Sequence, residues 1–141
     1  MSDKIFAPTT GRMKLGEKGM DITHLDWMSW SSWINNLSRF KYGVQLGTAA
    51  AGTFNLNCAY LGIPCIGYKG LDTQEELHPH CTVSEGNLDL AREIAKRLVT
   101  NQDFYEQCSR ESKEKYKECF DEEVYIYNMK KVIEGVINDT N

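Results

Sequence analysis

The sequence predicts an α/β domain of three layers, with a mostly parallel sheet of about four strands and helices that close the C-terminus. Three observations lead to this fold class. Short apolar runs alternate with segments of helical periodicity, a glycine-rich turn joins one such run to the next helix, and the C-terminal part has the pattern of successive capped helices. Alternation of this kind is typical of a parallel sheet with right-handed crossover connections.

Strands are expected where short apolar runs lie between turn residues. The run from Ile63 to Ile66 is apolar throughout, as in a strand that is covered on both faces. Similar short runs elsewhere complete the sheet. The predicted strands are residues 22–25, 43–47, 63–68 and 81–84.

Helices in the first half of the chain are predicted from capping residues and short apolar segments. Ser29 or Ser31 could cap a helix that runs to about Phe40. Thr53 could cap a second, shorter helix. The capping-box sequence at residues 72–75 predicts a single helical turn.

Three helices are expected to close the chain, and each follows a residue whose side chain can cap it. These residues are Asn87, Asn101 and Asp121. Apolar side chains recur along one face of each helix, which is the spacing of helices that cover a sheet. The side chains expected to point inward are Leu90, Ala91, Ile94, Ala95, Leu98 and Val99 in the first helix, Phe104, Cys108, Tyr116 and Phe120 in the second, and Tyr125, Met129, Val132, Ile133 and Val136 in the third.

The N-terminal segment fits this scheme poorly, because it holds one short apolar run, Ile5–Ala7, followed by glycines and lysines without periodicity. We therefore expect a poorly patterned segment at 1–20 and one domain at 21–141, in a chain that is a fragment of a larger protein. Trp27, Trp30 and Trp33 agree with a missing partner domain, since three large rings so close in sequence need a cover. Packing within the domain is nevertheless the favoured interpretation for at least two of them.

Composition excludes several classes of partner. The chain has 141 residues, a formal net charge of -4 and no dense cluster of lysine and arginine, which argues against nucleic acid and acidic membranes. It has neither a signal-peptide pattern nor a transmembrane segment, so we expect a cytoplasmic protein. Its five cysteines form no CxxC pair and are expected to be reduced thiols, with Cys58 and Cys65 in the core.

A cluster of His78, His80 and Cys81 has the residue types of a metal site. Pro79 between the two histidines and the lack of a second ligand pair favour ordinary loop and strand-start residues instead. No metal site and no cofactor are therefore predicted.

The stretch from Gly47 to Gly67 carries the strongest functional signal. Glycines at 47 and 52 let the backbone bend sharply and approach a ligand closely, Thr53 offers a hydroxyl, and Gly62 can end the helix that follows. Backbone N–H groups and the helix dipole at such a turn favour an anion, so a phosphate-bearing ligand is predicted. The alternative is that these glycines only make tight turns, since the stretch spells neither a P-loop nor the dinucleotide fingerprint.

From Ile22 onward, the order of elements resembles the C-terminal, donor-binding domain of GT-B glycosyltransferases. The resemblance is carried by Gly52-Thr53 before one helix, by Leu61-Gly62-Ile63-Pro64 before the next strand, and by Phe120-Asp121-Glu122-Glu123 at the junction of the closing helices. It implies a Rossmann-like fold whose last helix returns toward an N-terminal domain. It also implies that the ligand is a nucleotide-diphospho-sugar donor.

The resemblance places the donor in the glycine-rich loop and the helix after it. Gly52 and Thr53 would offer N–H and hydroxyl groups to phosphate oxygens. Gly47 and Thr48 would line the side of the loop that faces the sugar. Asn57 would lie near the ribose hydroxyls.

The chain departs from the family at two positions. Many members have glutamates where this sequence has Ala49 and Asn57; Asn57 could still hydrogen-bond a ribose, but Ala49 cannot replace a carboxylate. Arg12 and Lys18 look like the pair that neutralises the donor diphosphate in that family. The helix that should separate this pair from the next strand is missing, so a basic turn without that role is the alternative.

The expected function is that of the donor-binding half of a nucleotide-sugar glycosyltransferase, whose partners are the donor and a missing N-terminal domain or a second copy of the chain. No catalytic residue can be named; His24 and Asp26 lie near a strand end, where a structural role is commoner. The isolated chain is expected to be inactive, because catalysis needs the cleft between two domains. The alternatives are a stand-alone Rossmann-like binding module and a sugar-nucleotide epimerase of the same fold.

Overall fold

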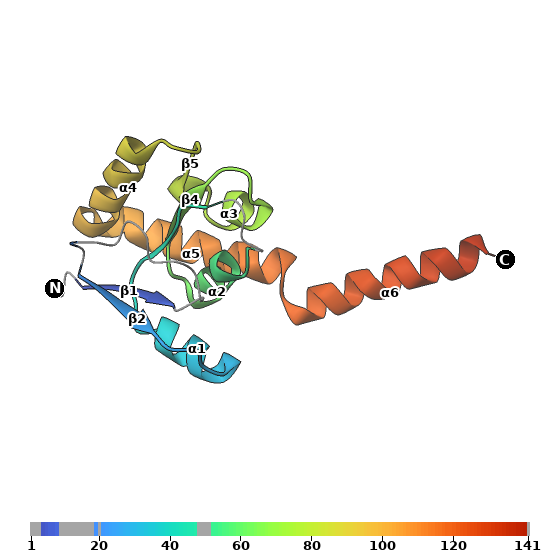
Figure 1. Cartoon of the computed structure of the whole chain (residues 1–141). Coiled ribbons are helices and arrows are strands. Elements are labelled where there is room, and N and C mark those ends of the chain that lie inside the picture. Colours follow the sequence, from blue (N-terminus) through green and yellow to red (C-terminus); the bar gives the residue numbers. More distant parts are fainter. Residues whose placement is uncertain (1–3, 9–18, 20, 48–51, 141) are drawn as a thin grey trace. The chain divides into compact units, whose positions relative to one another are not determined.

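The computed structural model describes residues 4–8, 19, 21–47 and 52–140. The chain divides into two compact units, Met1–Asn36 and Leu37–Asn141, which we describe in turn. Figure 1 shows their elements in sequence colours, from β1 in blue to α6 in red. The fold is mixed α/β with parallel strand pairs and C-terminal helices, as the sequence predicts at that level.

The first unit contains a two-stranded parallel sheet. β1 (Ile5–Pro8) pairs along its whole length with β2 (Ile22–Leu25). The strand at β2 is confirmed, whereas β1 lies in the N-terminal segment where we expected no regular pattern. So short an apolar run cannot be told from a loop by its sequence, and it becomes a strand because β2 supplies partners for its backbone.

A helix, α1 (Trp30–Leu37), follows this sheet. Of the two candidate caps, Ser29 precedes the helix, and its hydroxyl oxygen accepts a hydrogen bond from the N–H of Ser32 at 3.4 Å. The helix ends at Leu37, three residues before the predicted end at Phe40.

The tryptophans near α1 are more exposed than we expected. Trp27 and Trp30 are 87% and 63% exposed, and Trp33 is half-buried. The interpretation that at least two of the three rings pack within the domain is therefore wrong. Trp27 lies before α1 and Trp30 at its first position, and no part of the described first unit covers most of either ring.

The second unit is built on a three-stranded parallel sheet. Its order is β3 (Gly43–Gln45), β4 (Cys65–Tyr68) and β5 (Thr82–Val83), with Gly43 opposite Cys65. All three strands lie within the predicted ranges. The four predicted strands are divided between two sheets rather than gathered in one, because β2 pairs with β1.

The connection from β3 to β4 contains α2 (Thr53–Leu61), which ends at Gly62 as predicted. Gly62 has a φ of 70°, and carbonyl oxygens of the last turn accept the N–H groups of Gly62 and Ile63 at 3.0 and 2.8 Å. The predicted cap at Thr53 is wrong, because Gly52 occupies the capping position. Gly52 has a φ of 73°, a left-handed conformation that glycine adopts without strain and threonine does not.

After β4 the chain forms α3 (Asp72–Leu77) and a short 3-10 turn, η1 (Pro79–Cys81). The helical turn lies where the sequence predicts it, but the predicted capping box does not form. Leu71 is the capping residue, and no side chain caps α3. The Glu75 carboxylate reaches back further than a capping box would require, to the N–H of Gly70 at 3.2 Å.

The closing helices are α4 (Leu88–Thr100), α5 (Gln102–Cys119) and α6 (Glu122–Asp139). The three predicted caps are confirmed, because each side-chain oxygen accepts a backbone hydrogen bond from the first turn of its helix. The pairs are Asn87 with Leu90 at 3.1 Å, Asn101 with Phe104 at 3.0 Å and Asp121 with Glu123 at 3.1 Å.

The core of the second unit is formed by β4, η1, β5, α4 and α5. Its buried members are Ile66, Cys81, Val83, Ala91, Leu98, Phe104 and Cys108. Cys58 and Cys65 are also fully buried, as predicted, and all five cysteines are free thiols. The prediction that Leu90 and Val99 point inward is wrong, since both side chains are exposed, at the edge of the face that α4 buries.

The prediction that the last helix, α6, buries one face is wrong. Its apolar positions recur with the expected spacing, but none of its residues is buried. The side chains expected to point inward are exposed, namely Tyr125, Met129, Val132, Ile133 and Val136. They are exposed because no part of the described chain covers this face. Among the described residues, no helix is long and apolar enough to cross a lipid bilayer.

Candidate functional site

Two loops leave the carboxyl edge of the three-stranded sheet. The chain leaves β3 through Gly47 toward α2, and it leaves β4 through Lys69 and Gly70 toward α3. The carboxyl ends of parallel strands lie at one edge of a sheet, and open α/β sheets usually bind their ligands there. Gly47 and Gly52, the described ends of the predicted phosphate turn, therefore lie at the edge where this type of sheet binds ligands.

Gly52 joins the two loops by a direct contact. Its backbone is buried, and a Cβ atom built on it would collide with Oγ1 of Thr73 and lie 3.2 Å from Cγ2 of the same side chain. Both the left-handed backbone and this close approach require glycine. Because Thr73 lies in the first turn of α3, the beginnings of α2 and α3 are in contact.

Two buried polar atoms at this edge have no hydrogen-bond partner in the part of the chain that the structure describes. They are Oε1 of Gln45, at the end of β3, and Oγ1 of Thr73, beside Gly52. Leaving such an atom unpaired costs about 1–3 kcal/mol, so most native structures provide a partner. The hydroxyl of Thr73 can donate a hydrogen bond as well as accept one, and it could therefore bond a phosphate oxygen.

The structure brings several predicted site residues to this edge. Gly47 follows β3, and a Cβ atom built on it would meet nothing within 4 Å. Thr53 is exposed at the first position of α2. Asn57 lies one turn further along α2 and is only 4% exposed, so its side chain belongs to the interior of the unit.

Thr48, Arg12 and Lys18 lie outside the described residues. His24 lies on β2 and Asp26 directly after it, in the first unit. No catalytic role follows from the contacts of either residue.

A buried polar network lies under the site and fixes α2 against the sheet. The side-chain amide of Asn55 donates a hydrogen bond to Oε1 of Gln74. Gln74 in turn donates to the carbonyl oxygen of Cys65 at 2.9 Å and to Oγ1 of Thr82 at 3.1 Å. Gly67 makes room for this amide, because a Cβ atom there would lie 2.5 Å from Oε1 of Gln74.

His78 completes the network in its neutral form. Its Nδ1 accepts the N–H of Cys65 at 3.4 Å, so the proton is on Nε2, which donates to the carbonyl oxygen of Asn55 at 2.9 Å. Burial lowers the pKa of His78 to about 4, and the hydrogen bond to the Asn55 carbonyl opposes this shift only in part. The ring therefore joins α2 to β4 as an uncharged group at neutral pH.

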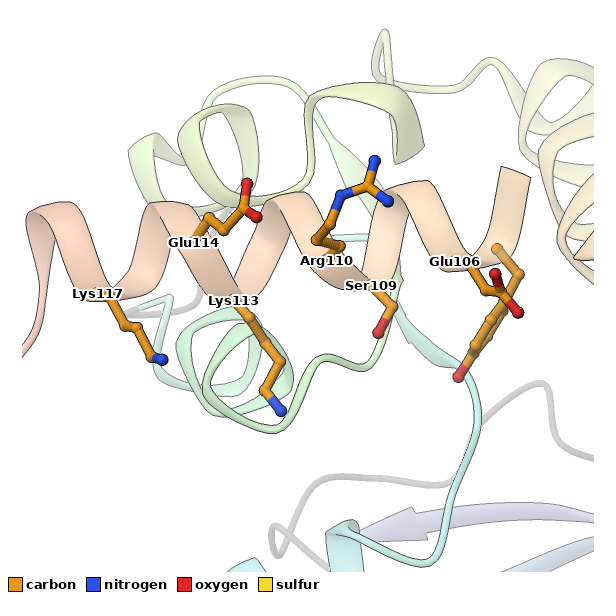
Figure 2. Close-up of a pocket in the computed structure, with 7 residues that line it drawn as sticks. Glu106, Ser109, Arg110, Lys113, Glu114 and Lys117 are labelled. Carbon is orange, nitrogen blue, oxygen red and sulfur yellow. The ribbon is translucent and has the colours of Figure 1, made fainter. Parts of the chain in front are cut away.

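A hollow lies along α5, and none of the predicted site residues lines it. It has a volume of about 350 Å3 and is lined by Tyr105, Glu106, Ser109, Arg110, Lys113, Glu114 and Lys117. Ser109 donates to the carbonyl oxygen of Gly62 at 2.6 Å, so the hollow adjoins the carboxyl end of α2, opposite Gly52. Figure 2 shows Lys113 and Ser109 on one side of α5 and Glu114 and Arg110 on the other. Side chains of both charges therefore line the hollow.

Sequence reasoning missed Thr73 as a site residue and the polar network beneath it. Thr73 is far from Gly52 in sequence, and only the parallel pairing of β3 and β4 brings their following helices together. Asn55 and Gln74 look like surface residues of two helices. The one available signal was Gly67, because a glycine inside a strand indicates a close approach of another group.

No protein-family model, curated protein or solved structure matches this chain.

Proposed function

We propose that this chain is the donor-binding domain of a nucleotide-sugar glycosyltransferase of the GT-B type, with a Rossmann-like arrangement of its sheet and helices. The single observation that carries the proposal is the buried, left-handed Gly52, which begins α2 at the carboxyl edge of the sheet. It lies beside the hydroxyl of Thr73, which has no hydrogen-bond partner within the described part of the chain. A helix N-terminus, a glycine that permits close backbone approach and a hydroxyl donor are together the groups that hold phosphate.

Each residue of the proposed site has a distinct role. Gly52 and Thr53 offer backbone N–H groups to the diphosphate, and Thr73 adds a hydroxyl from α3. Gly47 lies on the side of the loop that takes the sugar, where its open surroundings leave room for a ligand. Arg12 and Lys18 are proposed, by the family resemblance, to neutralise the diphosphate.

The proposal also includes a second domain, or a second copy of the chain, that covers α6. The support is the apolar face of α6, which is exposed over the whole helix. A contiguous apolar surface of this kind is typical of an interaction site. Transfer of the sugar would take place between the two domains, so the isolated chain is expected to bind the donor without transferring it.

A second candidate function is a binding module without chemistry. Two observations favour it: residues 43–61 contain no aspartate or glutamate, and Asn57 is buried rather than directed to solvent. Such a module would bind a nucleoside diphosphate at the same loop, but it would have no carboxylate there to assist transfer.

Calorimetric titration with uridine, guanosine and adenosine diphosphates tests the proposed site. The parent chain should bind at least one of them weakly, and inorganic pyrophosphate should compete. Thr73→Val should weaken binding about fivefold, the equivalent of one hydrogen bond of ~1 kcal/mol, without lowering stability, because it removes a buried hydroxyl that has no partner among the described residues. Thr100→Val, at the exposed end of α4, is the matched control and should leave binding unchanged.

Substitutions in the loop complete the test. Gly52→Val should abolish binding by blocking the backbone, whereas Gly47→Ala meets no atom within 4 Å and should retain the fold. The absence of heat with all three nucleotides at millimolar concentration would count against both candidate functions. Binding that survives unchanged in a folded Gly52→Val chain would show that the loop is only a turn.

A further inference from the structure

Two cysteines face each other in the core of the second unit. Cys81 ends η1, Cys108 lies on α5, and their sulfur atoms are 3.9 Å apart. Both are free thiols, with exposed fractions of 1% and 6%. A disulfide needs the sulfur atoms about 2 Å apart, so the two sulfur atoms must approach each other by about 2 Å to be joined.

The two thiols are not equivalent. The Cys81 thiol donates a hydrogen bond to the Cys108 sulfur, and this bond lowers the pKa of Cys108, with a smaller contribution from the positive charge of Arg97. Burial and the negative charge of Glu111 act in the opposite direction. The same hydrogen bond, together with burial, raises the pKa of Cys81. Cys108 is also the more exposed of the two, at 6% against 1%, so it is the thiol that reacts first, and Cys81 is the one that follows.

A small cavity adjoins this pair. It has a volume of about 10 Å3 and is lined by Leu77, His78, Pro79, His80, Cys81, Cys108 and Glu111. Beside it, Nε2 of His80 and a carboxylate oxygen of Glu111 form a hydrogen bond at 2.6 Å, and both side chains are partly exposed. A cavity of this size holds about one water molecule, so it favours a very small oxidant over a bulky disulfide such as oxidised glutathione.

We propose that Cys81 and Cys108 form a modification site at which hydrogen peroxide installs an intramolecular disulfide. The Cys108 thiolate attacks one peroxide oxygen, the O–O bond breaks, and the released hydroxide takes the proton that Cys108 gave up and leaves as water. The Cys81 sulfur then attacks the sulfenic sulfur of Cys108, the S–O bond breaks, and the hydroxyl leaves with the Cys81 proton as a second water. The two thiols lose two electrons in total, and one peroxide is reduced to two waters.

The chain contains its own controls for this reaction. Cys58 and Cys65 are a second buried pair, and a Cβ atom on Gly43 would lie 2.9 and 3.3 Å from their sulfur atoms. Neither of them lines the cavity. Cys119 is exposed and is the thiol that any oxidant reaches most easily. The proposal predicts that a cross-link forms at the first pair only, and it does not depend on what the loop after β3 binds.

The test is peroxide treatment of the Cys119→Ser chain, which prevents links between molecules. The protein is then unfolded, alkylated, digested without reductant and analysed by mass spectrometry. We expect a linked pair of peptides containing Cys81 and Cys108, lighter by two hydrogen atoms and separated by dithiothreitol, with Cys58 and Cys65 fully alkylated. The midpoint of thermal unfolding should shift upward, because the link closes a loop that contains β5 and α4.

Two variants separate the steps of the reaction. Cys108→Ser should give no link and leave Cys81 alkylated. Cys81→Ser should stop at the sulfenic acid of Cys108, which dimedone traps. If these two variants fold poorly, the presence or absence of the linked peptides in the Cys119→Ser chain still tests the proposal. Full alkylation of Cys81 and Cys108, at a peroxide dose that oxidises Cys119 in the parent, would overturn the proposal, as would a link between Cys58 and Cys65 that forms first.

Discussion

The helices α2 and α6 show opposite relations between sequence pattern and burial. α2 buries two asparagines, Asn55 and Asn57, next to Cys58 and Ala59. α6 has a regular apolar face and buries none of its residues. α2 is surrounded by the sheet, α3 and α5, whereas α6 is in contact mainly with α5. The neighbours of a helix therefore decide whether its side chains are buried. The side-chain pattern indicates only which face of the helix could pack against a neighbour.

The difference has an energetic side. The buried side-chain N–H of Asn55 is tolerated because Gln74 accepts its hydrogen bond, since an unpaired group there would cost about 1–3 kcal/mol. Oδ1 of the same amide has no hydrogen-bond partner among the described residues. The exposed apolar side chains of α6 contribute no comparable stabilisation to the folded chain. Substitutions around α2 should therefore change stability far more than matched substitutions in α6.

The largest expected difference is between Leu77→Ala and Val132→Ala. Leu77, on α3 beside α2, is fully buried, and its truncation should cost about 2–5 kcal/mol through lost burial and the cavity that it leaves. Val132 is exposed on α6, so its truncation should change stability by less than about 0.5 kcal/mol. Urea unfolding of dilute protein measures both values. Equal losses of stability would mean that α6 is covered in the isolated chain, and the contrast between α2 and α6 would then be wrong.

An intermediate effect is expected from pH. His78 is neutral in the folded chain with a pKa near 4, against 6.5 for an ordinary histidine, so the unfolded chain binds the extra proton in this window. The contribution of the neutral His78 ring to the free energy of unfolding is complete above pH 6.5 and is lost as the pH falls toward 4. Between pH 7 and 4.5 the loss should be about 2 to 3 kcal/mol.

The control for this pH effect is His78→Gln, whose amide can still donate to the Asn55 carbonyl but does not titrate. Its stability should change less than that of the parent over the same interval, although its stability at pH 7 is expected to be lower. Urea unfolding at several pH values gives both curves. Parallel curves for the two chains would assign the acid sensitivity to other groups.

The smallest expected effects are those of two glycine substitutions, and they differ in sign. Gly62→Ala, at the end of α2, should cost about 1 kcal/mol, because φ is 70° and the new Cβ would lie 2.7 Å from Cδ of Lys113. Gly135→Ala, within α6, meets no atom within 4 Å and should stabilise that helix by about 0.5–1 kcal/mol. Amide hydrogen exchange measured along each helix tests the two effects separately. Destabilisation by Gly135→Ala would show a close contact at α6.

Much of the second unit could be predicted from the sequence, because its signals are local. The caps at Asn87, Asn101 and Asp121 and the helix end at Gly62 each depend on residues within one turn. The three strands of the sheet are short segments between turns, each with one or more apolar residues. Caps, helix ends and short strands depend on residues that are close in sequence, so the residue types are enough to predict them.

The rest could not be predicted, because it depends on contacts between distant residues. β1 is a strand only because β2 pairs with it, and Asn55 is buried only because Gln74 meets it across α2 and α3. Thr73 joins the candidate site through Gly52, and no spacing in the sequence indicates that contact. The exposure of α6 is the reverse case, in which a regular pattern has no partner within the described chain.

The missing side chain of Gly67 has a consequence for how this sequence can change over time. The amide of Gln74 fills the space where a Cβ atom of residue 67 would lie, and the same amide holds Asn55, Cys65 and Thr82. Any larger residue at 67 displaces that amide, and any shorter residue at 74 leaves its partners unpaired. The two positions are therefore epistatic, and a substitution at one becomes tolerable only after a compensating change at the other.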